Sequence, residues 1–393
     1  MTADRAYLDH NASAPLRPEA RDAMLAVLDQ TGNASSVHAD GRAPRTTIEK
    51  ARAQVAKLVG GSDKNTIFTS GATEAANMAL SPLVKTALGD TVLKQLLVSK
   101  GEHPCVLSGG RFSPDAISMI PLLPNGEIDL AALSVKLDEI KEQGDPFLAA
   151  IMLVNNETGV IQPVQTAAGL VHDAGGYLLV DAVQAVGRVP VDINTLQADF
   201  MILSAHKIGG PQGAGALVLR DATVSPAPLI VGGGQEKSHR GGTENAAAIA
   251  GFGAAAEVAA QEIEKSEEIS RLRDSIEDAV ATISARSGNA SPAPVVFGKA
   301  ANRVANTTAF AVAGIPAETA LISLDLDGVS ISSGSACSSG SVKPSHVLAA
   351  MGVDEDLARC SVRISLGWSS TQDDVDRFAG AWEKMTNRLA TRR

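Results

Sequence analysis

FMILSAHKIGGPQGAG, residues 200–215, is the stretch that decides the fold of this chain. The short apolar run Phe200–Ser204 indicates a buried strand, and the glycines that follow indicate a turn. Lys207 therefore lies just past the carboxyl end of a strand, where open α/β sheets bind ligands. A lysine there can form a Schiff base with an aldehyde cofactor, and pyridoxal phosphate is the usual one. For a lone lysine, a surface position before a turn is the competing interpretation.

Strand and helix patterns alternate around this stretch. Apolar runs predict strands at 66–69, 96–99, 147–154, 177–180, 200–204 and 214–219, and helical patterns, including 18–30 and 44–59, fall between most of them. This alternation predicts an α/β fold with a mainly parallel sheet between layers of helices. After about residue 245 the pattern changes to one long helix over 243–286, short elements and a last helix over 373–393. We expect a large cofactor-binding domain of residues 16–249 and a smaller α+β domain of residues 1–15 and 250–393.

Composition excludes several classes of protein. The 393 residues are 45% hydrophobic and 20% charged, which is ordinary for a globular enzyme. A formal net charge of -10 argues against nucleic-acid binding. No apolar run is long enough to span a membrane, and the first residues lack the core of a signal peptide. The three cysteines suggest no disulfide framework, and the His and Cys spacing fits no metal site. We expect a cytoplasmic protein without metal.

Further polar residues stand at other strand ends. Asp181 follows the strand 177–180 and can pair with a protonated pyridinium nitrogen, although a helix N-cap is the alternative. The Ser-Gly-Ala-Thr turn 70–73 precedes a helix whose free N–H groups suit a phosphate, although it also fits a plain turn. His103 can stack on a planar ring and move protons, or be structural. Together with Lys207 these signals favour a pyridoxal phosphate site.

Residues 332–341, Ser-Ser-Gly-Ser-Ala-Cys-Ser-Ser-Gly-Ser, surround Cys337 with small polar residues. Such a stretch has no apolar face to bury and is typical of an exposed loop. The thiol is either a reactive nucleophile or a bystander in a serine-rich linker. Cys105 and Cys360 are expected to be buried packing residues.

At this point the chain resembles the NifS/IscS-type cysteine desulfurases, which are fold-type I pyridoxal-phosphate enzymes of the class V aminotransferase family. The matching segments run in the family's order at residues 7–9, 33–38, 69–74, 102–104, 155–159, 181–184, 204–207, 232–236, 240–245, 332–340 and 362–367. The likeness therefore covers nearly the whole chain, and the lysine and cysteine segments are its most specific parts.

The resemblance implies a role for each matching residue. Lys207 would hold the cofactor, His103 would stack on its ring, and Cys337 would attack the substrate sulfur. Asp181 would contact the ring nitrogen, Gln184 the ring hydroxyl, and Asn156 the ring or the substrate. The phosphate would be bound by Ala72, Thr73, Ser204 and His206, and the partner subunit's phosphate by Thr243. Arg363 would pair with the substrate carboxylate. The contact made by Thr243 implies a homodimer.

The implied reaction is removal of sulfur from L-cysteine. Lys207 would move the α proton, alanine would be released, and Cys337 would carry the sulfur as a persulfide to an acceptor protein. Iron–sulfur cluster assembly is one such destination, although the longer C-terminal extension with which housekeeping members dock a scaffold is not expected here. A related lyase acting on selenocysteine is the alternative, and a sulfur-handling protein without enzymatic activity is a third. Cys337 argues against a pure lyase, which needs no persulfide carrier.

Overall fold

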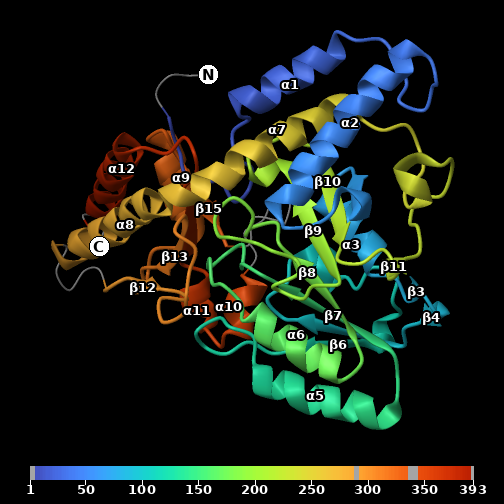
Figure 1. Ribbon diagram of the computed structural model, residues 1–393. Coiled ribbons are helices and arrows are strands. Elements are labelled where there is room, and N and C mark those ends of the chain that lie inside the picture. The colour runs from blue at the N-terminus through green and yellow to red at the C-terminus, as the bar shows by residue number, and fades with distance from the viewer. Residues whose placement is uncertain (1–4, 287–291, 335–343, 391–393) are drawn as a thin grey trace.

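The computed structural model describes residues 5–286, 292–334 and 344–390. Its centre is a seven-stranded sheet (Figure 1). In spatial order the strands are β2 (Thr66–Thr69), β10 (Gly215–Leu219), β9 (Phe200–Ser204), β8 (Tyr177–Asp181), β7 (Phe147–Met152), β5 (Gln95–Ser99) and β6 (Ile117–Ile120). Only β10 runs antiparallel to its neighbours in this sheet. The predicted α/β class with a mainly parallel sheet is confirmed.

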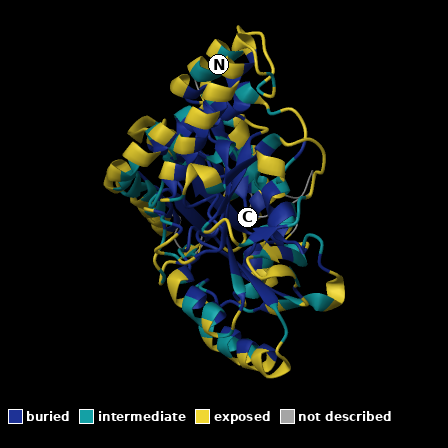
Figure 2. Ribbon diagram, turned by 45° about the vertical axis from the view of Figure 1, so that its right-hand side comes forward, coloured by how far each residue is buried: buried dark blue, intermediate teal, exposed yellow. Residues whose placement is uncertain are grey.

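Side chains from successive strand residues enter different cores on the two faces of the sheet. In β7, Ala149 and Ile151 belong to one apolar cluster, and Leu148 and Ala150 belong to another. The first face is covered by long helices, and the second by short ones and a small three-stranded sheet. The long helices are α1 (Pro18–Leu28), α2 (Ala39–Leu58), α5 (Leu130–Gln143), α6 (Val164–Asp173) and α7 (Ala246–Glu262); the short elements are α3 (Ala72–Ala79), α4 (Pro104–Leu107), β3 (Leu83–Thr86), β4 (Gly89–Val92) and β11 (Ser225–Pro226). The strands of the large sheet are buried, apart from the partly exposed edge strand β6, while exposed residues gather on the outer sides of the helices (Figure 2).

A second, antiparallel sheet carries the C-terminal part of the chain. Its order is β12 (Val295–Val296), β13 (Thr307–Ala311), β16 (Ser361–Ser365) and β15 (Ser332–Ser333). One face packs on α8 (Ser266–Arg286), α9 (Ala317–Leu326) and α12 (Gln372–Ala390) in a separate apolar cluster. The N-terminal β1 (Ala6–Tyr7) joins this cluster by pairing with β14 (Val329–Ser330). Two short helices, α10 (His346–Ala350) and α11 (Glu355–Ala358), complete the fold.

The other face of this second sheet packs toward the large sheet. In β13, Phe310 lies in the cluster of the C-terminal helices, whereas Ala309 and Ala311 lie in the core of the large sheet. Helix α7 also adds Phe252 and Ala256 to the core of the large sheet. The division into residues 16–249 and residues 1–15 with 250–393 stays a prediction.

Two helix predictions differ from the structure. Helix α2 begins at Ala39 rather than residue 44, and both Gly41 and Pro44 lie inside it. A Cβ on Gly41 would lie 2.3 Å from the Ser36 carbonyl oxygen, so close packing explains the glycine in the first turn of the helix. The long helix predicted over 243–286 is divided into α7 and α8 by a 3-10 turn, Ile263–Lys265, which no glycine or proline marks.

Within the described residues, none of the helices combines the length and apolar character that crossing a membrane requires. That same part of the chain holds no cluster of three His, Cys, Asp or Glu side chains placed to bind a metal.

Candidate active site

A cavity of about 490 Å³ opens at the carboxyl ends of the large sheet's parallel strands. Both sheets contribute to it, since β16 supplies Arg363 from the C-terminal part of the chain. The predicted site residues that line it are Ala72, Thr73, His103, Asn156, Asp181, Gln184, Ser204, His206, Lys207 and Arg363. Thr243 is exposed and does not line it. Cys337 lies outside the described residues.

Lys207 reaches the cavity from the turn that follows β9. The turn Ala205–Lys207 is one 3-10 helix, directly continuous with the strand. The Nζ of Lys207 donates to the carbonyl oxygens of Asn11 at 2.7 Å and Ala12 at 2.8 Å. The N-terminal segment therefore holds the amine at the cavity wall, a contact between residues about two hundred positions apart that sequence reasoning missed.

Asp181 ends the neighbouring strand β8 and is almost fully buried. Its Oδ1 accepts a hydrogen bond from the Val183 backbone N–H at 2.9 Å, and among the described residues Oδ2 has no hydrogen-bond partner. Burial raises the pKa of the Asp181 carboxyl to about 6, and the Val183 N–H and the charge of Lys207 oppose the rise. A carboxylate in this setting suits a cationic N–H donor inside the cavity.

Glu102 is a buried carboxyl that sequence reasoning missed, although it precedes the predicted His103. It is fully buried, its Oε1 accepts from the Met152 N–H, and its Oε2 is buried without a partner among the described residues. Burial, reinforced by the charge of Asp181, raises the pKa of Glu102 well above its usual range. Two close carboxylates cannot both ionise cheaply, so Glu102 holds the proton and Asp181 the charge.

His103 caps α4 and lines the cavity beside Cys105. The Cys105 backbone N–H donates to His103 Nδ1 at 3.2 Å, and the Cys105 Sγ lies 3.0 Å from the same nitrogen. Burial and the charge of Lys207 lower the pKa of His103 to about 4, while burial raises the pKa of Cys105 far above that of a free thiol. The imidazole is therefore neutral with its proton on Nε2. Cys105 packs against the apolar core as predicted, but it is half-buried rather than buried, and its protonated thiol lines the cavity. Cys360 is buried, as predicted.

The turn between β2 and α3 forms a concave backbone surface. The first N–H groups of α3, at Ala72 and Thr73, point out of the helix end and have no acceptor within the helix. A Cβ on Gly215 would lie 2.6 Å from the Gly71 Cα, so only glycine lets β10 pass so close beneath the turn. This geometry suits an anion of phosphate size.

Glu74 braces the same turn. Its Oε2 accepts from the Ser70 N–H at 2.8 Å, and Arg240 Nε donates to its Oε1 at 3.0 Å. Arg240 lowers the pKa of Glu74 below its usual range and neutralises its charge near the anion surface. His206, whose Nδ1 lies 3.3 Å from Ser13 Oγ, closes the other side. Burial and Lys207 lower the pKa of His206 to about 4.

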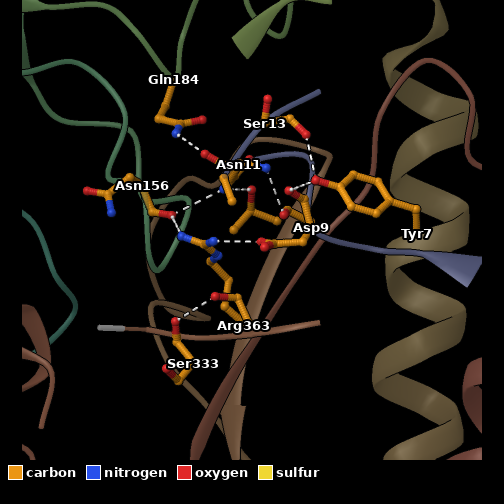
Figure 3. Close-up of polar contacts among 12 residues, drawn as sticks. Tyr7, Asp9, Asn11, Ser13, Asn156, Gln184, Ser333 and Arg363 are labelled. Carbon is orange, nitrogen blue, oxygen red and sulfur yellow. Dashed lines mark hydrogen bonds and ion pairs between the residues drawn. The ribbon is translucent and has the colours of Figure 1, made fainter. Parts of the chain in front are cut away.

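Arg363 and Asn156 lie next to each other in the wall of the cavity (Figure 3). Arg363 donates from Nη1 to the Asn156 carbonyl at 3.0 Å and from Nη2 to Asp9 Oδ1 at 2.7 Å. The buried Nε of Arg363 and Oδ1 of Asn156 have no partner among the described residues. Both residues therefore keep an unpartnered polar atom in the wall of the cavity.

Gln184 is held from both ends of its amide. Its Nε2 donates to the Asn11 carbonyl at 3.0 Å (Figure 3), and its Oε1 accepts from Arg188 Nη1. Arg188 fixes which end of the amide is the oxygen, so the NH₂ group lies on the side of Asn11 and Lys207. Sequence reasoning identified Gln184 but not Arg188, four residues further along the chain.

The family model for aminotransferase class-V matches residues 6–378. The chain belongs to this family. It is 40% identical over 389 residues to a cysteine desulfurase IscS of Dictyoglomus turgidum, covering 98% of this chain and 95% of that protein. It is 39% identical to the mitochondrial cysteine desulfurase of Drosophila melanogaster, covering 98% of this chain and 81% of that protein. The predicted resemblance is confirmed.

A solved structure supports the same kinship. The NifS-like protein from Rickettsia africae superimposes with a TM-score of 0.82 at 31% identity, covering 98% of this chain and 99% of that one. The similarity extends over both sheets, so the cavity lies in a shared fold.

Proposed function

We propose that the protein is a pyridoxal-phosphate-dependent cysteine desulfurase that converts L-cysteine to L-alanine and leaves a persulfide on Cys337. The observation that carries the proposal is one cavity that brings together the amine of Lys207, the buried carboxyl of Asp181 and a helix end suited to phosphate. The names of the full-length relatives support the same reaction.

The residues present fit the cofactor. Asp181 has a buried carboxyl whose Oδ2 lacks a partner among the described residues, as a carboxylate facing a protonated ring nitrogen requires. Lys207 would bind the aldehyde carbon, Gln184 the ring hydroxyl, and His103 would stack on the ring. The phosphate would be held by Ala72, Thr73, Ser204 and His206. When bound, pyridoxal phosphate supplies an electron sink for negative charge at the substrate Cα.

The protein's own residues handle the protons. Lys207 takes the proton from Cα, with its amine guided by the carbonyls of Asn11 and Ala12. His103 is neutral at physiological pH and its Nε2 can exchange a proton with the substrate thiol. The Cys337 thiolate then attacks the substrate sulfur. An S–S bond forms as the C–S bond breaks, and the Cβ keeps the bonding electrons and takes a proton. Lys207 then returns a proton to Cα, which gives alanine.

Arg363 and Asn156 would position the substrate. The free Nε of Arg363 can donate to the substrate carboxylate while Nη2 stays on Asp9. Asn156 Oδ1 would accept from the ring or the substrate.

The partners follow from the same proposal. Thr243 is exposed in one subunit, which fits a contact with the phosphate of the partner subunit in a homodimer. A sulfur-acceptor protein would receive the persulfide, for iron–sulfur cluster assembly or other sulfur trafficking. The cytoplasmic location stays a prediction.

Alanine release from L-cysteine and from selenocysteine tests the proposal against the selenocysteine lyase alternative. We expect the wild-type holoenzyme to release alanine from L-cysteine, and Cys337→Ala to lose this activity while keeping activity on selenocysteine. Cys360→Ala is the matched control and should keep both. Full activity of Cys337→Ala on L-cysteine would contradict the persulfide mechanism and favour a lyase.

A further inference from the structure

A second, smaller cavity of about 180 Å³ lies on the other side of Lys207, between the helices of the large sheet and the C-terminal part of the chain. About half of its lining residues are polar or charged, and the apolar half includes Val186, Ile208, Ile269, Leu366 and Trp368. The chemistry proposed above uses none of these side chains.

Arg188 lines this cavity and forms no ion pair with a carboxylate among the described residues. Its Nη1 donates to the Gln184 carbonyl at 2.6 Å and to Gln184 Oε1. Among the described residues, its Nε and Nη2 have no hydrogen-bond partner and no carboxylate pairs with it. One edge of a guanidinium is therefore left for a ligand. Burial, with the charge of Arg363, lowers the pKa of Arg188 to about 9.

Other arginines in the described residues have partners for their guanidinium groups within the fold. Those paired with a carboxylate are Arg17 with Glu262, Arg52 with Glu236, Arg303 with Glu277 and Arg363 with Asp9. Arg111 has no carboxylate, but both of its terminal nitrogens donate to backbone carbonyls. A guanidinium beside apolar walls is costly without an anion, so the free edge of Arg188 calls for one.

The remaining charges around the cavity leave a positive balance. Arg17 and Glu262 neutralise each other, Lys265 and Glu268 have opposite signs, and the amine of Lys207, which also lines the cavity, would be engaged by the cofactor in the holoenzyme. His10 is neutral, because burial and the charges of Arg188 and Arg17 lower its pKa to about 3. A ligand with a single negative charge balances Arg188, whereas a dianion would meet the carboxylates of the rim.

We propose that this cavity binds a small aliphatic monocarboxylate. Its carboxylate accepts from Nε and Nη2 of Arg188 in a bidentate pair, and its short hydrocarbon part packs on Ile269 and Trp368. The site is separate from the substrate position, because Arg363 faces the other cavity. Arg188 also holds Gln184, which lines the first cavity, so occupancy of the second cavity is coupled to the first.

Titration of the holoenzyme with isobutyrate tests the proposal, with the neutral isobutyramide as the matched control. Calorimetry without L-cysteine should show saturable binding of isobutyrate at one site per subunit, and binding of isobutyramide at least tenfold weaker. Arg188→Met should weaken isobutyrate binding at least tenfold, and Arg188→Lys should restore part of it. Because no turnover is measured, the result is independent of the proposed desulfurase activity.

Two further measurements keep the proposal falsifiable if Arg188→Met folds poorly. Ala305→Leu, which fills the cavity without touching the guanidinium, should also abolish binding. Isobutyrate should alter desulfuration without competing with L-cysteine. Three results would overturn the proposal: no saturable binding, unchanged binding in both variants, or purely competitive inhibition. The last result would place the carboxylate at Arg363.

Discussion

Two regions of this protein bury charge in opposite ways. Beside β2, Arg52 and Glu236 are both buried and form an ion pair, and the Phe68 backbone N–H donates to the same carboxylate at 2.9 Å. At the carboxyl ends of β5 and β8, Glu102 and Asp181 are equally buried but have no cation bonded to them among the described residues. The first arrangement satisfies its charges within the fold, whereas the second keeps Glu102 protonated and leaves the charge of Asp181 for a ligand. Under the proposed function, the first pair holds the structure and the second serves the reaction.

The largest effect is expected from removing the one amine of the cavity. Lys207→Ala should abolish the absorption band of the covalently bound cofactor and lower desulfuration by about 10³-fold or more, because it removes both the attachment point and the base. Absorption spectra and alanine assays measure this. Lys57→Ala, on an exposed face of α2, is the control and should change neither.

Asp181→Asn should separate function from stability. Loss of the carboxylate should lower kcat by about 10²-fold, because the ring nitrogen loses its anionic partner. The apoprotein should be no less stable, since the variant removes a buried carboxyl that lacks a counter-ion. Steady-state kinetics and urea unfolding of the apoprotein measure the two effects. A large loss of stability would show that Asp181 stabilises the fold, as the Arg52–Glu236 ion pair does.

Glu236→Gln should give the opposite result. It leaves the buried Arg52 paired only with the half-exposed Glu49, so the free energy of unfolding should fall by up to about 3–5 kcal/mol while the folded fraction keeps its activity per molecule. Replacing both residues by methionine should recover most of the loss in urea unfolding. Equal destabilisation in the single and double variants would argue against the pairing account.

The pH dependence of apoprotein stability should sharpen the contrast. The pKa of Asp181 is raised to about 6 and that of Glu157 to about 7, in both cases chiefly by burial. Each of these two carboxyls therefore keeps a proton in the folded state at pH values where the unfolded state has lost it, so its own contribution to stability falls as pH rises between about pH 4 and 7. The buried neutral His10, His103 and His206, whose pKa values are lowered to about 3 or 4, contribute in the opposite direction. The contribution of Asp181 is about 3 kcal/mol as an upper limit. Urea unfolding of the wild type and of Asp181→Asn from pH 4 to 8 isolates it, because the difference in stability should shift in favour of the variant as pH rises from about 4 to 6.

The smallest effect is expected where an ion pair lies at the partly solvated rim of the cavity. Glu74→Gln should cost about 1 kcal/mol, less than Glu236→Gln, because water compensates Arg240. Urea unfolding of the two variants under the same conditions measures the difference. A loss of stability as large as that of Glu236→Gln would show that the burial of an ion pair does not determine how much its removal destabilises the protein.

Sequence patterns predicted the parts of this molecule that are local in the chain. Lys207 and Asp181 follow apolar strands directly, so their place at one edge of the sheet could be inferred from strand patterns alone. The contact of Asp9 with Arg363 joins residues 354 positions apart, and no spacing rule finds it. The unpartnered oxygen of Glu102 and the unpartnered nitrogens of Arg188 were also missed. Whether a polar atom has a partner depends on how distant segments pack together, which the local sequence does not show. The break between α7 and α8 carries no local signal either.

The most direct test is to trap the persulfide. The holoenzyme should be mixed with one equivalent of L-cysteine, alkylated at once, and analysed by peptide mass spectrometry alongside Cys337→Ala. We predict one additional sulfur on Cys337, with one alanine released per persulfide formed, and none on Cys105 or Cys360. Alanine release without added sulfur on Cys337, or a persulfide on another cysteine, would contradict the account.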